Sequence, residues 1–386
     1  MTVKRRDFLK LGSAAAVGAG VMALTGCDRK DESTGPAAPA VITRQTFEWR
    51  MSTTWPAGLE FFQVGPGSAT DFARRVEEMS DGRIRIRVYS AGELLPAFEG
   101  FDAASAGRQV QLNHGCSYFW AGKSWAAQYF TAVPFGMSFQ GHHAWLREGG
   151  GLELYEEVYA PFNLVPLVAG CTGVQPVGWF RRPVSGLADF RGLNIRMPGL
   201  AGDIYNAIGA NARLLPAGEL FAALERGTLD AVEWVGPYSD RALGLHNAAK
   251  NYYSSGWHEP ATTTEVAVNK DAWDSLPKDL QAIMRNAAAA CSVISHTWLE
   301  ARNGEALEDL VTNHGVRFGP LPDDVMRALL EASKDIMNAQ AAKDPLVRRV
   351  HQSYFNFKAK HDRWQQNSEQ EFQTKLRDLG AQLQLA

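Results

Sequence analysis

Two kinds of hydrophobic pattern alternate along most of the chain. Apolar residues at every second position are typical of strands, and a period near 3.6 is typical of helices. Segments 46–53 and 83–90 have the strand pattern, and 67–82 between them has the helix pattern. Further strand candidates are 110–115, 162–170, 194–197, 212–216, 230–234 and 264–269, and further helix candidates are 97–108, 199–208, 217–226, 271–313 and 322–342. Strands separated by helices indicate βαβ units, so we predict an α/β fold with parallel sheets.

Residues 345–380 have the pattern of one long amphipathic helix with an apolar and aromatic stripe. Such a stripe must be covered by something. Two alternatives are open. The helix packs back on the protein's own lobes, or it is exchanged with a second copy in a homodimer.

The composition is that of a globular protein. The chain has 386 residues, of which 45% are hydrophobic and 21% charged, enough for a large core and more than one ordinary domain. Two lobes are therefore expected. The formal net charge is −3, and residues 1–26 carry a net +3, so the rest of the chain carries −6. A mildly acidic chain without a basic stripe is a poor nucleic-acid binder.

Residues 1–26 have the pattern of an export signal, with a basic start, an apolar run and a small-residue end. The apolar run is shorter than the roughly 20 residues that a membrane-spanning helix needs. Arg5 and Arg6 resemble a twin-arginine signal. Because Lys4 stands where Ser or Thr is usual, the general export route stays open.

The sequence Leu24–Cys27 resembles a bacterial lipoprotein box. It predicts cleavage before Cys27 and lipid on its sulfur; the alternative is an ordinary core cysteine. Asp28 resembles the signal that keeps lipoproteins in the inner membrane. Residues 27–45 are polar with Gly, Pro and Ala, which indicates a flexible tether. We therefore expect a periplasmic protein anchored to the inner membrane through Cys27.

The remaining cysteines offer little chemistry. Cys116, Cys171 and Cys291 form no CxxC or Cys/His cluster, so neither a disulfide scaffold nor a zinc site is expected. The motifs GxSxG, HExxH and CxxCH, and a GxGxxG after a strand, are also absent. His114 lies two residues before Cys116, but we expect this pair to be structural rather than a base and a nucleophile. The protein is therefore not expected to be an enzyme.

Five segments carry a resemblance to a known family: "MSTTWPAG", "RIRVYSAGELLPAFEGFDAASAG", "DFRGLNIRMPGLAGDIYNAIGA", "LPAGELFAALERGTLDAVEWVGPYSD" and "VNKDAWDSLP". Over about residues 46–345 the chain resembles the solute-binding proteins of tripartite ATP-independent periplasmic (TRAP) transporters, the DctP-like family. The pairing of "GVQPVGWFRR" with "EWVGP" is similar to the branch that binds 2-oxo acids and other monocarboxylates, such as the alpha-keto acid-binding periplasmic protein.

The resemblance implies a two-lobed periplasmic-binding-protein fold with a cleft between the lobes and a long C-terminal helix. Lobe I would comprise residues 46–172 and 262–315, and lobe II residues 173–261 and 316–344. The resemblance also implies a function. The lobes would close on a small carboxylate, and the membrane subunits of a TRAP transporter would then take it up with an ion gradient.

Arg196 is the first candidate for ligand binding. It ends a short strand just before Pro198 and Gly199, where the chain breaks at a lobe surface. A guanidinium can donate two parallel N–H groups to a carboxylate, which Lys cannot do. The alternative is a surface arginine.

A bound cation is the second implied feature. The resemblance assigns a carboxylate of Glu233, the main-chain oxygen of Trp234, the amide oxygen of Gln175 and a second carboxylate from Glu259 to the cation. Neighbours on a strand point to opposite faces, which allows Glu233 and Trp234 to contribute differently. The alternative is a surface carboxylate at 233 and a core side chain at 234. Oxygen ligands without sulfur or imidazole suit sodium or calcium.

The charges make this cation important. Arg196, Glu233, Glu259 and a monocarboxylate together carry −2, and burying that charge without a metal is costly. Calcium would neutralise it and sodium would leave −1. The count favours a divalent ion, while the family resemblance favours sodium, and both stay open.

Lobe I is expected to supply the other ligand contacts. Tyr118 would donate its hydroxyl and Phe119 would form an apolar wall, while Phe180 of lobe II would close the cavity. The alternative for these aromatics is core packing. Pyruvate, another 2-oxo acid and lactate all remain candidate ligands. A larger organic or sugar acid is an alternative ligand. A further alternative is that the protein is an exported enzyme acting on small carboxylates.

Overall fold

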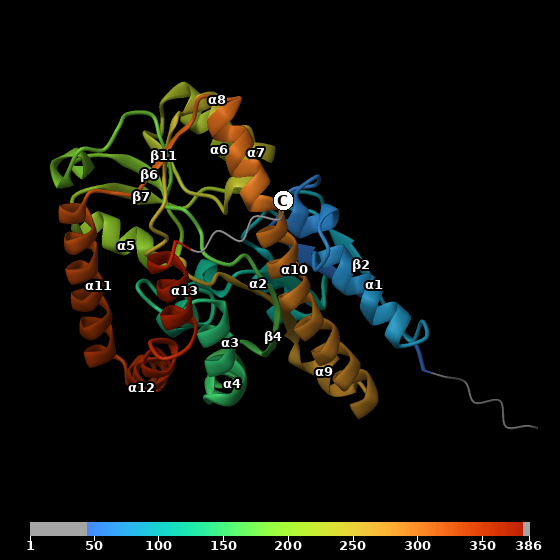
Figure 1. Ribbon diagram of the computed structural model, residues 1–386. Coiled ribbons are helices and arrows are strands. Elements are labelled where there is room, and N and C mark those ends of the chain that lie inside the picture. The colour runs from blue at the N-terminus through green and yellow to red at the C-terminus, as the bar shows by residue number, and fades with distance from the viewer. Residues whose placement is uncertain (1–44, 381–386) are drawn as a thin grey trace, which may run out of the picture. The chain divides into compact units, whose positions relative to one another are not determined.

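The computed structural model describes residues 45–380 (Figure 1). The expected export signal, the lipid-attachment residue Cys27 and all but the last residue of the expected tether lie outside this range. Within the described residues, no helix combines the length and the hydropathy that a membrane crossing requires.

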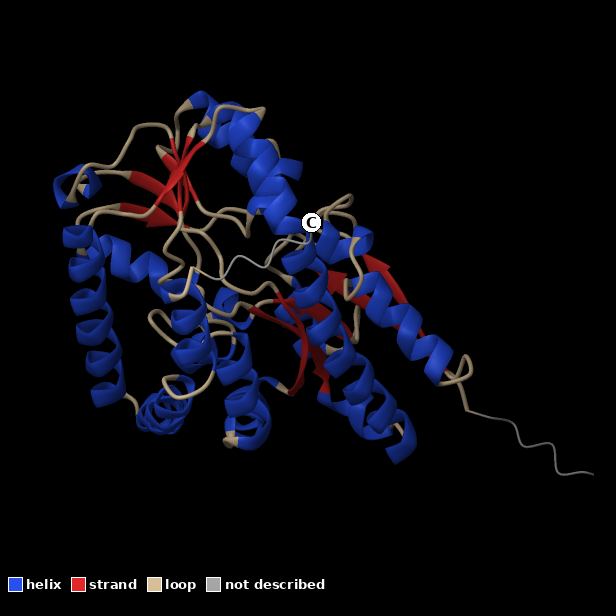
Figure 2. Ribbon diagram, in the orientation of Figure 1, coloured by secondary structure: helices blue, strands red, loops and turns tan. Residues whose placement is uncertain are grey.

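The strands form two separate sheets (Figure 2). The first has the order β2–β1–β3–β10–β4, with the bounds β1 Phe47–Thr53, β2 Ile84–Tyr89, β3 Leu112–Gly115, β4 Leu164–Cys171 and β10 Thr263–Asn269. The second has the order β11–β9–β5–β8–β6–β7, with the bounds β5 Gly178–Phe180, β6 Asn194–Arg196, β7 Asn211–Arg213, β8 Ala231–Val232, β9 Asn251–Tyr253 and β11 Arg317–Gly319. The fold is a two-lobed α/β fold, with one sheet at the centre of each lobe.

Both sheets are mixed, so the expectation of parallel sheets was wrong in part. In the first sheet β10 runs antiparallel to β3 and β4, and in the second β5 runs antiparallel to β8 and β9. Each of these two strands is the first one that the chain forms after it has crossed from the other sheet. Hydrophobic periodicity carries no information on strand direction. The lobe boundaries near 172, 261 and 315 stay a prediction.

Thirteen α-helices lie among the described residues: α1 Ala69–Met79, α2 Gly100–Ala106, α3 Phe139–Glu148, α4 Gly151–Tyr159, α5 Gly199–Ala207, α6 Ala217–Arg226, α7 Pro237–Ala242, α8 Leu245–Ala248, α9 Lys270–Ser275, α10 Lys278–Thr312, α11 Asp323–Lys343, α12 Pro345–Gln365 and α13 Glu369–Asp378. The helix expected over 271–313 is broken between α9 and α10. Leu276 is extended there because the ring of Pro277 disfavours helical geometry in the residue before it. The long helix α10 packs against β4 and α1 of the first lobe and against α7 of the second.

The C-terminal segment forms two helices rather than the expected single helix over 345–380. The side chain of Asp344 caps α12 by accepting from the N–H groups of Leu346 and Val347. Val347, Val350 and Tyr354 share one face of α12 and are fully buried. The chain then turns, and α13 has no buried residue.

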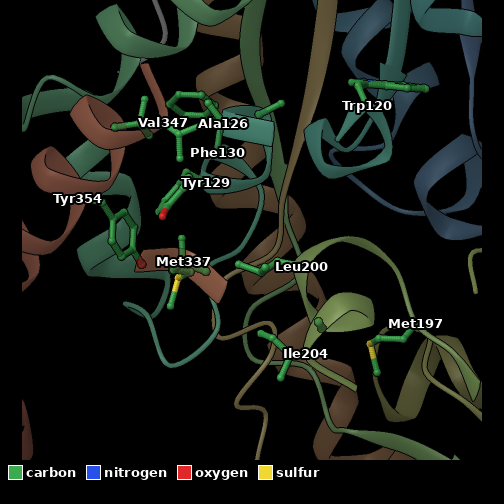
Figure 3. Close-up of a cluster of buried hydrophobic side chains, with 14 of the residues drawn as sticks. Trp120, Ala126, Tyr129, Phe130, Met197, Leu200, Ile204, Met337, Val347 and Tyr354 are labelled. Atoms are coloured by element: carbon green, nitrogen blue, oxygen red, sulfur yellow. The ribbon is translucent and has the colours of Figure 1, made fainter. Parts of the chain in front are cut away.

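Tyr354 joins α12 to the first lobe. Its hydroxyl accepts a 2.7 Å hydrogen bond from the N–H of Met137, and its ring lies 6.1 Å from that of Tyr129 (Figure 3). The first half of the apolar stripe is therefore covered by the protein's own chain. Trp364, Phe372 and Leu379 remain exposed at 65%, 58% and 77%. A homodimer through this end of the chain stays a prediction.

We expect Tyr354→Ala to lower the free energy of unfolding by about 3–5 kcal/mol, because it leaves a cavity in a closed core. Urea denaturation followed by circular dichroism measures this change. Trp364→Ala lies on the same helix in an exposed position and should change the stability by less than about 0.5 kcal/mol. Equal effects of the two substitutions would show that α12 is not docked on the first lobe.

Candidate functional site

Arg196 and Glu233 meet at the carboxyl ends of two neighbouring strands. Strands β6 and β8 are parallel, with Arg196 opposite Val232, and Glu233 follows directly. The N–H of Glu233 donates to the carbonyl oxygen of Arg196 at 3.2 Å. In α/β sheets this end of the strands is where ligands bind.

The strand β8 ends before Glu233, so the expectation of a strand through Trp234 was wrong. The carboxylate of Asp240 accepts from the backbone N–H groups of Val235 and Gly236 at 3.0 and 2.9 Å. These hydrogen bonds turn the chain into α7. Glu233 and Trp234 therefore lie in a connection, and opposite faces of a strand do not explain their orientation.

The guanidinium of Arg196 and the carboxylate of Glu233 form a buried ion pair. Nη1 of Arg196 donates to Oε2 of Glu233 at 2.6 Å and to the carbonyl oxygen of the same residue at 2.7 Å. The two side chains are only 2% and 0% exposed. The alternative interpretation of Arg196 as a surface arginine is therefore wrong.

One edge of this guanidinium is free for a ligand. The Nε of Arg196 is buried and has no hydrogen-bond partner among the described residues. Together with Nη2 it forms the side-on edge that can donate to both oxygens of a carboxylate. The guanidinium also lies over the ring of Trp234, with 5.3 Å from its carbon to the ring centre. These contacts hold the charged group in place.

Gln175 and Glu259 lie on the two segments that cross between the sheets. The N–H of Gln175 donates to the carbonyl oxygen of Glu259 at 3.0 Å. The side-chain nitrogen of Gln175 donates to Thr172 at 2.9 Å, and the hydroxyl of Thr262 donates to Glu259. The amide oxygen of Gln175 is left buried without a partner in the described part of the chain.

The structure also brings two carboxylates and one imidazole close together. One atom each from Glu233, His258 and Glu259 lies within 4.8 Å of the others. The Oε1 of Glu233 is buried and unpartnered among the described residues, and so is the amide oxygen of Gln175, whose N–H bonds to Glu259. The carboxylate and amide oxygens of Glu233, Glu259 and Gln175 fit a hard cation, which prefers such ligands. The assignment of the main-chain oxygen of Trp234 stays a prediction.

His258 is the residue of this group that the sequence analysis missed. Its Nε2 lies 3.8 Å from Oε1 of Glu233. Burial lowers the pKa of its imidazole to about 4, so the ring is neutral at neutral pH. Its position beside Glu259 was the one available signal, and a lone histidine next to a carboxylate is too common a pattern to decide a role.

Burial dominates the electrostatics of the two carboxylates. It raises the pKa of Glu233 to about 8, although the charge of Arg196 offsets part of the effect. It raises the pKa of Glu259 to about 8 as well, and the nearby charge of Glu233 adds to the rise. Without a cation, the carboxyl of Glu259 therefore holds its proton at neutral pH, whereas Glu233 is paired with Arg196. A bound cation would stabilise their ionised forms.

Tyr118 comes to this group from the first lobe. It lies in the 3-10 helix η2, Ser117–Trp120, and packs against Gly199, three residues after Arg196. A Cβ on Gly199 would lie 3.0 Å from the Cβ of Tyr118, and its φ of 58° also favours glycine. Burial raises the pKa of Tyr118 well above its ordinary value, with the charge of Glu259 as the next cause. The hydroxyl therefore stays a hydrogen-bond donor.

The two other predicted aromatics differ in position. Phe119 is partly buried, and its ring centre lies 6.3 Å from that of Trp55. Phe180 lies on β5 and packs against Phe190 and Tyr253 in the core of the second lobe. Among the described residues, no ring contact joins Phe180 to the group around Arg196. Its expected place in the cavity is not supported, and the alternative of core packing describes it.

A buried carboxylate fixes the helix that carries Tyr118. Glu265 of β10 accepts from Nε1 of Trp120 at 2.9 Å and from the hydroxyl of Tyr159 at 2.8 Å, and the hydroxyl of Tyr155 donates to its other oxygen. Burial raises the pKa of Glu265 to about 7. The only signal in the sequence was one glutamate inside an apolar strand.

The thiol of Cys116, next to Ser117 and Tyr118, is buried. Burial raises the pKa of Cys116 well above its ordinary value, so the reactive thiolate is disfavoured. The Nδ1 of His114 accepts from Nε1 of Trp55 at 2.7 Å and is not available as a base. These contacts agree with a structural role for both residues.

The sequence also matches a known family. Residues 63–344 match the profile of the bacterial extracellular solute-binding proteins of family 7. The chain therefore belongs to this family, and it is a solute-binding protein of the TRAP transporter class.

Three similar proteins are informative. A monocarboxylate 2-oxoacid-binding periplasmic protein of Nostoc sp. is 39% identical over 367 residues, which cover 95% of this chain and 97% of that protein. A TRAP solute-binding protein of Bordetella bronchiseptica has a TM-score of 0.84 at 35% identity, covering 88% and 100% of the two chains. Its structure is a mixed-occupancy dimer with copurified calcium and picolinate at one site. A TRAP periplasmic solute-binding protein of Pseudoalteromonas atlantica, with bound sodium and pyruvate, has a TM-score of 0.82 at 36% identity, covering 86% and 99%.

The raised pKa of Glu259 predicts a pH dependence of stability. In the cation-free protein the folded state keeps its proton up to about pH 8, whereas the unfolded chain loses it near the ordinary value of 4.5. Stability should therefore fall as pH rises between these values, by at most about 1.4 kcal/mol per pH unit for one such group. Glu259→Gln should reduce this slope in denaturant titrations run with a chelator.

The exposed Glu305→Gln provides the control and should leave the pH profile unchanged. Superimposable profiles of wild type and Glu259→Gln would contradict the assignment of a proton to this carboxyl.

Proposed function

We propose that the protein captures a small monocarboxylate, either a 2-oxo acid such as pyruvate or the 2-hydroxy acid lactate, together with sodium or calcium. The observation that carries this proposal is the buried Arg196–Glu233 pair. In this pair, Nε of Arg196 and Oε1 of Glu233 are both buried without a partner among the described residues, as is the amide oxygen of Gln175. A carboxylate and a cation are the two groups that such a site requires.

The chain's own residues have distinct parts in this capture. The free edge of Arg196 binds and orients the ligand's carboxylate, and the hydroxyl of Tyr118 donates to another ligand oxygen. Glu233, Glu259 and Gln175 hold the cation, which supplies positive charge to balance the buried carboxylates and to attract the ligand's oxygens. The similar proteins with bound sodium and pyruvate, or calcium and picolinate, support this arrangement.

Burial of the site supports a closed, short-ligand receptor. Arg196, Glu233, Glu259 and Gln175 are each at most 2% exposed. Ligand binding favours closure of the lobes by its higher affinity for the closed state. The membrane subunits of a TRAP transporter would then receive the acid in the periplasm. The family is one of binding receptors, and the buried Cys116 gives no support to an enzyme acting on small carboxylates.

Calorimetric titration tests the binding function. The mature protein is first treated with a chelator and titrated with pyruvate and lactate, and the titrations are repeated with sodium or calcium. We expect binding only when a cation is restored. Arg196→Ala should weaken it by at least about 30-fold, because loss of one partner of a buried hydrogen-bonded charge pair costs about 2–5 kcal/mol.

Arg213→Ala is the matched control. Arg213 lies opposite Arg196 in the register of β6 and β7 but is exposed, so its removal should leave the affinity unchanged. Thermal melting of each variant shows whether it is folded. If neither acid binds the wild type with either ion, the monocarboxylate proposal is wrong, and a larger organic or sugar acid is the next ligand to test.

Lipid anchoring through Cys27 is a separate proposal, since it rests on the lipoprotein box alone. In a bacterial host the wild type should partition with the inner membrane and Cys27→Ser should not. The binding titrations of the mature domain should be indifferent to this change. Recovery of the wild type in the soluble periplasmic fraction would overturn the anchoring and leave the binding proposal intact.

A further inference from the structure

The imidazole of His258 lacks partners although it is fully buried. Neither ring nitrogen has a hydrogen-bond partner among the described residues, and its side chain is 0% exposed. Two other buried histidines each have one partner: His114 bonds to the indole of Trp55, and His142 lies 3.4 Å from the carbonyl oxygen of Phe130. Buried polar groups are nearly always paired in native structures. His258 therefore points to a missing ligand atom.

The distance to Glu233 indicates where that atom belongs. The Nε2 of His258 lies 3.8 Å from Oε1 of Glu233, too far for a direct hydrogen bond. Oε1 is itself unpartnered. The two atoms are close enough to share a third group, such as a ligand oxygen beside a cation. The imidazole therefore faces the same region as the proposed cation ligands.

The chemistry of the ring favours a ligand oxygen over the cation. Sodium and calcium prefer oxygen ligands, and Glu233, Glu259 and Gln175 already offer them. A neutral imidazole carries one N–H donor and one acceptor nitrogen, and either nitrogen can hold the proton. It can donate to a keto oxygen in one tautomer and accept from a hydroxyl in the other.

We propose that His258 binds the oxygen on C2 of the captured acid and so distinguishes 2-oxo and 2-hydroxy acids from plain carboxylates. This inference rests on the proposed function and extends it to a specificity-determining residue. The same side chain serves pyruvate and lactate because its two tautomers match a keto and a hydroxyl oxygen. Propionate has the same carboxylate but no oxygen on C2, so it gains nothing from His258.

The test is a comparison of His258→Leu and His258→Gln with the wild type, each titrated with pyruvate, lactate and propionate at fixed calcium. His258→Leu should weaken pyruvate and lactate by about 10- to 100-fold, because the ligand oxygen then faces an apolar group. Propionate binding should not change. His258→Gln keeps a donor and an acceptor and should recover part of the lost affinity. Calcium titrations without an acid should give the same affinity for wild type and His258→Leu.

His246→Leu, at a buried histidine on α8 whose ring neighbour is His314, should bind all three acids as the wild type does. The inference is overturned if His258→Leu binds pyruvate normally. It is also overturned if this variant weakens pyruvate and propionate equally, or alters calcium binding alone, since His258 would then act on the carboxylate, the packing or the cation. A wild type that binds none of the acids is a different result: the proposed function itself fails, and the inference fails with it.

Discussion

The ion pair between Arg196 and Glu233 is almost entirely removed from water, and the surrounding site is organised by that constraint. A buried pair of charges is stable only when the remaining donors and acceptors are satisfied. Glu233 uses one carboxylate oxygen and its carbonyl oxygen on Nη1 of the guanidinium. The other carboxylate oxygen and the Nε of Arg196 are left without partners. These two free atoms, one donor and one acceptor, are the basis of the proposed anion and cation binding.

A second buried carboxylate supports this site from the first lobe. Glu265 accepts hydrogen bonds from Trp120, Tyr155 and Tyr159, and Trp120 ends the short helix that carries Tyr118. The bond from Trp120 ties this helix to Glu265, and the two tyrosines of α4 satisfy the rest of the carboxylate. The position of the segment that carries Tyr118 therefore depends on a residue that lies deep in the first sheet.

Local signals in the sequence predicted much of the fold. The helix expected over 217–226 coincides with α6, which ends where Gly227 adopts a left-handed conformation with a φ of 77°. Strand direction was not predictable, because residue pattern does not depend on which way a neighbouring strand runs. The end of β8 was also missed, since the hydrogen bonds that the carboxylate of Asp240 accepts from the backbone are visible only in three dimensions.

The grouping of the candidate site residues was predicted mainly from the family resemblance. Arg196, Glu233 and Glu259 come together, whereas Phe180 lies in the core. His258 was missed because its burial and its distance to Glu233 depend on how distant segments fold against each other. The same holds for Glu265.

The backbone hydrogen bonds between the two crossing segments have an evolutionary consequence. Gln175 donates to the carbonyl of Glu259, and Thr172 donates to the carbonyl of Thr262, so the two segments run side by side in a fixed alignment. An insertion or deletion in either segment would shift a proposed cation ligand relative to the other. The two segments thus form one structural unit, and exchange between homologous proteins should succeed only when both are transferred together.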